Sequence, residues 1–196
     1  MNAILRPLLV AFILGIPVSA ASLKAQTMRD VVKLMPDTLT PLLTHNNLLD
    51  FPDYLDSQMK AEVTNRLGGT SEMKRLTDDF AEINLTSATS LQLKLLPKGK
   101  GKVVCLIRTF TINDSIGDSQ VQFYTTDWKL LPIKKHLSSF SVHDQAAFMC
   151  ASLSAETTDL TLRWSYPLSI EFDGQSEKKV KAGQPTVLKW NGKQYK

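Results

Sequence analysis

Residues 90–107, SLQLKLLPKGKGKVVCLI, decide the fold of this chain. Over 90–96, leucines alternate with polar residues, which is typical of a strand that buries one face. Residues 97–101 combine proline, glycine and lysine, which indicates a turn. The following stretch, 102–112, starts with apolar residues on both faces and is typical of a central strand. Because a parallel crossover needs a dozen or more residues, we expect the two strands to be antiparallel neighbours.

The same period of two recurs through the second half of the chain. Because these segments follow one another at hairpin spacing, they predict a meander. The segments are strands at 80–85, 119–124, 128–133, 160–164 and 168–172, a polar loop at 174–185 and a tight hairpin at 187–195. The predicted core includes Leu91, Leu93, Leu95, Val103, Ile107, Val121 and Phe123.

Residues 141–153 fit two different structures. Residues 141–144, SVHD, resemble the capped start of a helix, whereas 147–153 also fit the inward face of a strand. A clear strand follows at hairpin distance, so we favour the strand.

The chain before the sheet is expected to be helical. Apolar residues at 28, 31, 32 and 35 lie on one helical face, with Thr27 as the N-cap, Asp30 in a capping box and Pro36 as the end. Thr40-Pro41 resembles a second start, which would close at 46–47. A third short helix, capped by Asp53, would run to residue 59.

These patterns predict an α+β fold, in which N-terminal short helices pack on a mainly antiparallel, meander-type β-sheet. We expect a single globular domain over 26–196, mainly helical at 26–66 and mainly strands at 70–196. Gly68-Gly69, between the two regions, is expected to be a turn with a positive φ angle.

Residues 1–20, MNAILRPLLVAFILGIPVSA, have the organisation of a secretory signal peptide. Arg6 precedes a short apolar run, Pro17 ends it, and small residues precede a cut after Ala20. A cut as late as residue 25 also fits. The apolar run is too short for the roughly 20 residues that span a bilayer, so we expect a periplasmic or secreted protein without stable membrane insertion.

Removal of this peptide changes the charge balance. The full chain of 196 residues has a net charge of +4, and loss of residues 1–25 takes away Arg6 and Lys24, which leaves 21 basic and 19 acidic residues. Two groups of lysines, at 98, 100 and 102 and at 178, 179 and 181, are interpreted as loop residues without interleaved aromatic residues. We therefore expect no nucleic-acid partner.

Two cysteines, Cys105 and Cys150, remain after export. In an oxidising compartment they could form one disulfide. Both lie in apolar strings, so two buried free thiols are the alternative.

No motif for catalysis, a metal or a cofactor appears in the sequence. The three histidines, His45, His136 and His143, have no second ligand at metal-binding spacing, and neither GxSxG nor a phosphate loop is present. Carboxylates at 50, 53 and 56, and oxygen-bearing residues at 113–118, are interpreted as caps and turns, with calcium as a minor alternative. A hydrolase would need His136 or His143 to meet a carboxylate in the fold.

Several strings resemble domain-of-unknown-function family 3256, a group of exported proteins from anaerobic Gram-negative bacteria. They are 35–43 (MPDTLTPLL), 47–51 (NLLDF), 59–65 (MKAEVTN), 68–69 (GG), 76–79 (LTDD), 123–128 (FYTTDW) and 151–155 (ASLSA). The resemblance implies a compartment and a lineage, but no activity, substrate or catalytic residue. The lineage also implies O-glycosylation at Asp-Ser/Thr motifs, which makes Thr38 and Ser115 candidate sites.

The sequence thus favours a non-enzymatic interaction protein of the periplasm or cell surface, whose partner is an unknown protein or envelope component. The alternative is a carrier that holds a small apolar ligand or lipid between the sheet and the helices. A filled interface between the two layers would favour the first function, and an apolar cavity of several hundred Å³ would favour the second.

Overall fold

The computed structural model describes residues 27–113, 116–138, 148–172, 175–182 and 184–196. The signal peptide, both cut sites, Ser115, His143 and residues 141–147 therefore lie outside the described residues.

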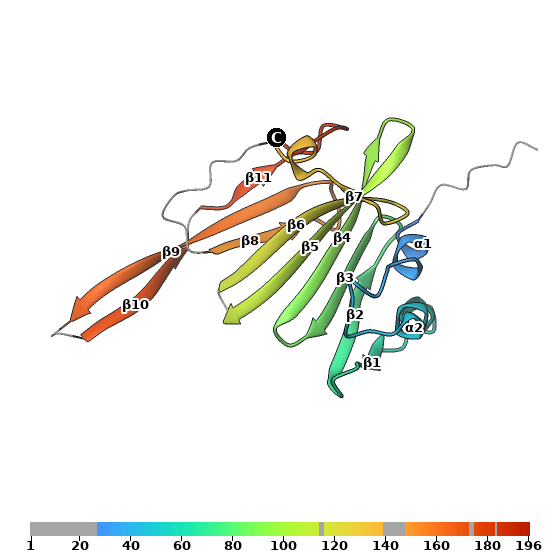
Figure 1. The fold of residues 1–196 in the computed structure, drawn as a ribbon, viewed down its shortest axis with the longest axis horizontal. Helices are drawn as coiled ribbons and strands as arrows, with labels where there is room; N and C mark the ends of the chain where they lie inside the picture. Colours follow the sequence, from blue (N-terminus) through green and yellow to red (C-terminus); the bar gives the residue numbers. More distant parts are fainter. Residues whose placement is uncertain (1–26, 114–115, 139–147, 173–174, 183) are drawn as a thin grey trace, which may run out of the picture.

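Seven strands form one antiparallel meander (Figure 1). Each strand pairs with the next one in the chain, as the hairpin spacing predicts. The strands are β1 (Glu62–Thr64), β2 (Thr70–Leu76), β3 (Phe80–Thr86), β4 (Thr89–Lys98), β5 (Gly101–Asn113), β6 (Ile116–Thr125) and β7 (Leu130–Leu131). The α+β prediction is confirmed, although β1 and β2 were not expected from the sequence. Between them, Gly68 has a φ of 76°, as predicted for this turn.

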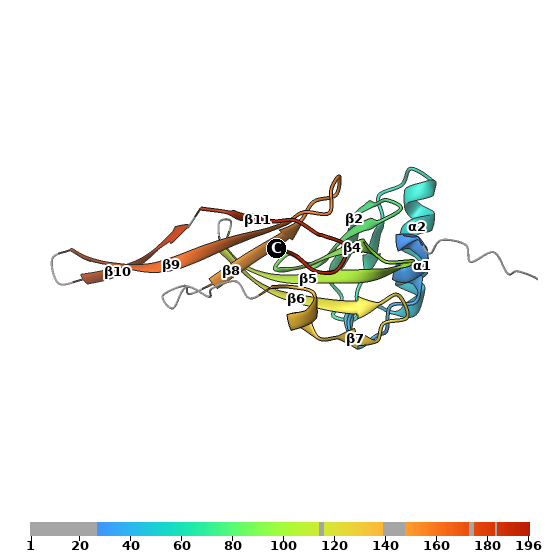
Figure 2. The ribbon, with the colours of Figure 1, turned by 90° about the horizontal axis from the view of Figure 1, so that it is seen from above.

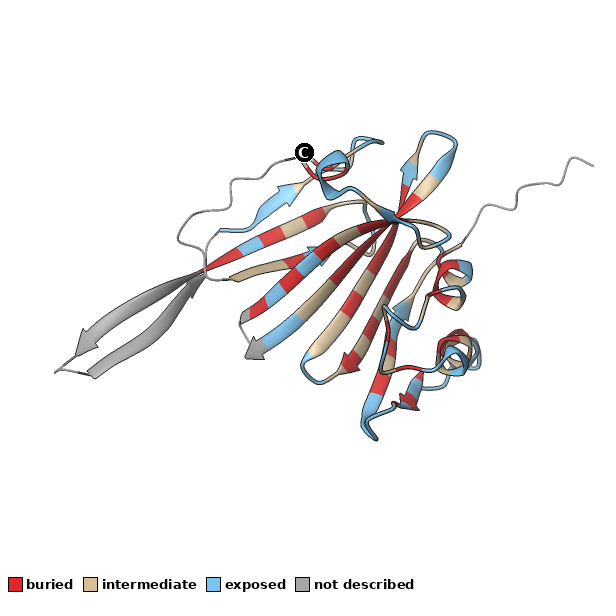
Figure 3. Cartoon of the chain, viewed as in Figure 1, coloured by how far each residue is buried: buried red, intermediate tan, exposed pale blue. Residues whose placement is uncertain are grey.

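The central strands bury both of their faces, which Figure 3 shows as bands of buried residues along β4 and β5. On the side of the helices, Leu93 pairs with Leu106 across the two strands. On the opposite side, the neighbouring pair is Lys94 and Cys105. All seven predicted core residues are buried, but they divide between two clusters, one on each face of the sheet.

Helix α1 (Met28–Lys33) begins where the sequence predicts and ends at Lys33, before the expected stop at Pro36. Thr27 caps it, with Asp30 completing the reciprocal capping box. The indole Nε1–H of Trp128 donates to the carbonyl of Val31 at 3.0 Å, so the turn after β6 fixes the helix to the sheet.

Helix α2 (His45–Asp56) replaces the two short helices that we expected around Thr40 and Asp53. Thr44 is the N-cap, and its amide and hydroxyl exchange hydrogen bonds with Asn47 at 2.9 and 3.2 Å. Pro52 lies inside the helix and removes one backbone bond. The prediction was wrong because burial of Leu48, Phe51 and Pro52 against the sheet offsets that loss.

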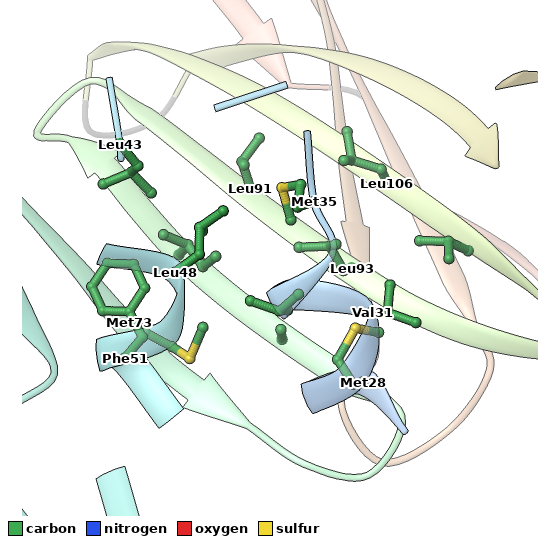
Figure 4. Close-up of a cluster of buried hydrophobic side chains, with 14 of the residues drawn as sticks. Met28, Val31, Met35, Leu43, Leu48, Phe51, Met73, Leu91, Leu93 and Leu106 are labelled. Atoms are coloured by element: carbon green, nitrogen blue, oxygen red, sulfur yellow. The ribbon is translucent and has the colours of Figure 1, made fainter. Parts of the chain in front are cut away.

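The layer between the helices and the sheet is filled by large apolar side chains (Figure 4). Those with no exposed area come from both sides of the interface. They include Met28, Val31, Leu43, Leu48 and Phe51 from the helical layer, and Ile83, Leu91, Leu93 and Leu106 from the strands.

A second sheet covers the opposite face (Figure 2). It contains β8 (Phe148–Leu153), β9 (Leu160–Phe172), β10 (Gln175–Ala182) and β11 (Thr186–Leu188). Strand is therefore the correct interpretation of 148–153, the part of the ambiguous segment that is described. Strand β9 runs unbroken where we expected two strands, and most of the predicted loop 174–185 is β10.

The backbone of β10 and the distal part of β9 forms a hairpin that projects from the body of the molecule (Figure 1). A strand outside the core needs no alternation of apolar residues, which explains why the sequence pattern indicated a loop. The terminal hairpin is confirmed by the bridge between Trp190 and Tyr195, with Gly192 at a φ of 87°. The expected strand 128–133 is reduced to β7, followed by a 3-10 turn, η1 (Ile133–Lys135).

One edge of β8 is bonded by side chains of the first sheet rather than by another strand. The amides of Met149, Ala151 and Leu153 point toward the first sheet at alternate positions. They donate to Asp118 Oδ1 at 3.4 Å, Ser119 Oγ at 3.0 Å and Gln92 Oε1 at 2.9 Å. These bonds satisfy the backbone amides on this edge of β8, which would otherwise be free to pair with a strand of another chain.

The corrected start of α2 can be tested by removing its cap. Thr44→Ala is expected to lower the free energy of unfolding by about 1 kcal/mol, because the Asn47 amide loses its acceptor. Asn46→Ala, at an exposed position in the first turn of the same helix, is the control and is expected to leave stability unchanged or slightly raised. Urea unfolding measures both, and equal stability of the two variants would place the helix start elsewhere.

Candidate functional site

The buried ionisable side chains that are the best candidates for a reactive site lie between the two sheets. Lys94 on β4 is 1% exposed, yet its ammonium is fully engaged. Its Nζ lies 2.9 Å from Asp79 Oδ2, donates to the carbonyl of Ala155 at 3.0 Å, and sits 5.9 Å from the ring centre of Phe80. This lysine therefore ties the segment after β8 to the first sheet, and its bonds account for its burial.

His136 is the second buried group, at the end of η1. Its ring stacks on Phe123, with 5.1 Å between centroids, and lies parallel to Trp190 at 6.4 Å. Nδ1 is 3.0 Å from the carbonyl of Pro132, and Nε2 is 2.6 Å from Lys98 Nζ. This burial could not be predicted from the sequence, because the hairpin that covers His136 is more than fifty residues away in the chain.

These two contacts define the state of the imidazole. An ammonium can only donate, so Nε2 accepts from Lys98 and Nδ1 carries the hydrogen that Pro132 accepts. Burial lowers the pKa of His136, and the charges of Lys98 and Lys135 lower it further, against the opposing effect of the Pro132 carbonyl. His136 is therefore neutral and contacts a cation, whereas the hydrolase alternative needed a contact with a carboxylate.

Tyr195 and Cys105 complete the same buried region. The Tyr195 hydroxyl has no hydrogen-bond partner among the described residues, and its ring packs against Phe123 and Trp190. Burial raises the pKa of the Tyr195 phenol and of the Cys105 thiol. Cys105 is thus protonated at neutral pH, which is opposite to the setting of a nucleophilic cysteine.

The second cysteine lies far from the first, and both thiols are free. Cys150 Sγ is 3.7 Å from the place that a Cβ on Gly117 would occupy. Gly117 pairs with Thr111, six residues along β5 from Cys105, which corresponds to about 20 Å. A disulfide needs Cα atoms within about 7 Å, so the structure favours free thiols. Only Cys105 is buried as that alternative expected, because Cys150 is half-buried.

The other candidate residues lie apart from one another. His45 is exposed at the start of α2, and Asp56 at its end pairs with Arg29 at 2.7 Å. In the described part of the chain, no three metal-ligating side chains gather at one place. Thr38 is exposed in the turn after α1, where a modifying enzyme could reach it.

The hollows on the surface of the described residues include two at the ends of strands. One, of about 290 Å³, is lined by Thr27, Arg29, Asp30, Leu76, Thr77 and Asp78. The other, of about 330 Å³, is lined by Asn65, Leu67, Gly69, Thr70, Thr86 and Ser87. Both are open to solvent, and the first lies between the start of α1 and the turn after β2.

The environment of His136 predicts a pH dependence of stability. The pKa of His136 is depressed in the folded protein. Its contribution to the free energy of unfolding is therefore fully present above the ordinary pKa of 6.5 and is lost as the pH falls through the lowered pKa. Urea unfolding between about pH 5 and pH 8 is expected to show this loss in the parent and a flatter profile in His136→Gln. His45→Gln is the control, and an unchanged slope in His136→Gln would contradict the assignment.

Comparison with known proteins agrees with this architecture. A solved domain of an uncharacterized protein from Porphyromonas gingivalis W83 has the same fold, with a TM-score of 0.68 at 18% identity, over 87% of this chain and 97% of that one. No curated protein matches the chain. Among the described residues, no helix is long and apolar enough to cross a membrane.

The family suggested by the sequence strings is also found. The sequence model of the protein family of unknown function DUF3256 matches residues 20–145. The chain therefore belongs to the DUF3256 family.

Proposed function

We propose that this protein is an exported, non-enzymatic interaction module that acts in the periplasm or at the cell surface. Export is supported by the sequence of residues 1–20, with its basic start, short apolar run and small residues before the cut.

The packing of the helices on the sheet is the observation that carries the proposal. Side chains with no exposed area fill this layer from both sides, among them Phe51, Leu48 and Leu93. A carrier for an apolar ligand needs a pocket of several hundred Å³ lined by such residues. The filled layer supports an interaction module over a carrier.

The polar groups also support a module rather than an enzyme. The hydrogen bonds of Lys94 and His136 hold separate segments of the chain together, since Lys94 binds Ala155 and His136 binds Lys98. Burial keeps Cys105 protonated. Residues in the strings that resemble the family also have structural roles. Asn47 completes the capping box of α2 by accepting from the Thr44 amide, and Asn65 accepts from the amides of Leu67 and Gly69 to build the turn between β1 and β2.

Export is tested by fractionating cells that express the full chain. The periplasmic or secreted form is expected to begin at Ala21 or Gln26. Ile13→Arg, which places a charge in the apolar run, is expected to keep the protein in the cytoplasm uncut, whereas Arg6→Lys is the control and leaves export unchanged. A parent chain found in the cytoplasm with residues 1–20 intact would contradict the proposal.

The choice between module and carrier is tested by native mass spectrometry of protein purified from its own host. The expected mass is that of the polypeptide without a bound lipid or other small molecule. A lipid that stays with the protein in stoichiometric amount would revive the carrier alternative. Covalent glycan at Thr38 would add mass that persists after denaturation, so the two additions are distinguishable.

A further inference from the structure

One end of the molecule concentrates positive charge. Three segments meet there: the end of the β4–β5 hairpin at 97–102, the η1 segment at 132–138 and the chain end at 186–196. Together they hold eight lysines and no aspartate or glutamate, although the chain from residue 26 onward is nearly neutral. The lysines are Lys98, Lys100, Lys102, Lys134, Lys135, Lys189, Lys193 and Lys196.

Direct bonds hold the three segments in one surface, which we call the basic end. Trp190 Nε1–H donates to the carbonyl of Pro97 at 2.7 Å, and Lys98 Nζ donates to His136 at 2.6 Å. The amide of Tyr195 donates to the carbonyl of His136 at 2.8 Å. The relative positions of the lysines are therefore fixed by the fold, in the region where Figure 1 shows the C-terminus, β11 and β7.

Apolar side chains lie within this basic end. Ile133, next to Lys134 and Lys135, is 44% exposed, and Trp190 is only half-buried. Lys100, Lys134, Lys135 and Lys193 are all exposed, and Lys189 pairs with Asp159 at 2.5 Å. An exposed isoleucine with two lysines next to it can enter the headgroup layer of a membrane while the ammonium groups remain on the phosphates.

We propose that the basic end docks on a membrane surface that contains anionic phospholipid. This inference rests on the proposed function, because it names the partner of the same interaction module. The site is built from turns at one end of the sheet, which suits an extended surface better than an enclosed small ligand. Charge complementarity supplies the attraction, and Ile133 adds an apolar contact that a soluble polyanion would not use.

The size of the effect follows from the number of lysines involved. Each lysine close to an anionic bilayer raises the partition coefficient about fivefold, so three lysines account for about a hundredfold. The attraction is expected to weaken steeply with added salt, because screening shortens its range to about 10 Å at 0.1 M ionic strength.

The test is co-sedimentation of the purified mature protein with vesicles of phosphatidylglycerol and phosphatidylcholine, and with vesicles of phosphatidylcholine alone. The triple variant Lys100→Gln, Lys134→Gln, Lys135→Gln is expected to lose about a hundredfold in binding to the anionic vesicles. The matched control is Lys60→Gln, Lys74→Gln, Arg163→Gln, which removes the same charge from exposed positions elsewhere and is expected to bind like the parent. Ile133→Ser is expected to weaken binding severalfold without changing its salt dependence.

Equal binding of the two triple variants, or equal binding to both kinds of vesicle, would overturn the proposal. Binding of heparin without binding of anionic vesicles would also overturn it and would assign the basic end to a soluble polyanion. A protein that stays in the cytoplasm would contradict the proposed export. An exported protein that does not bind anionic vesicles would contradict only the proposal of a membrane partner.

Discussion

The structure depends on one constraint, which is that β4 and β5 bury apolar side chains on both faces. A sheet with one apolar face needs a single covering layer, whereas Leu93 and Leu106 on one side and Cys105 and Ile107 on the other require two. The helices supply the first layer and the strands β8, β9 and β11 the second. Both layers exist because the central hairpin cannot be left exposed to water on either side.

The two sheets are joined by polar contacts as well as by apolar ones. Lys94 reaches across to Ala155, and Gln92, Ser119 and Asp118 accept from the edge of β8. These polar side chains therefore serve to hold the two sheets together. The surface, by contrast, carries an uneven distribution of charge, with eight lysines in the three segments of the basic end.

Sequence periodicity predicted the elements that bury an alternating face, and it failed where burial is partial or distant. The leucines of β4 were easy to identify, whereas β2 buries only Ser71 and Met73 and gives little alternation. Pro52 suggested a helix break that packing overrides. The burial of His136 could not be predicted, because it depends on Trp190 and the chain end folding back over it.

The claim that β4 and β5 form the doubly covered centre is tested most directly by native-state hydrogen exchange. The account predicts that amides of Leu93–Leu96 and Val103–Ile107 exchange only on global unfolding, with the same free energy on both strands. Amides of β1 and β7, at the two edges of the sheet, are expected to exchange sooner. Exchange of the central amides as fast as those at the edges would contradict the account.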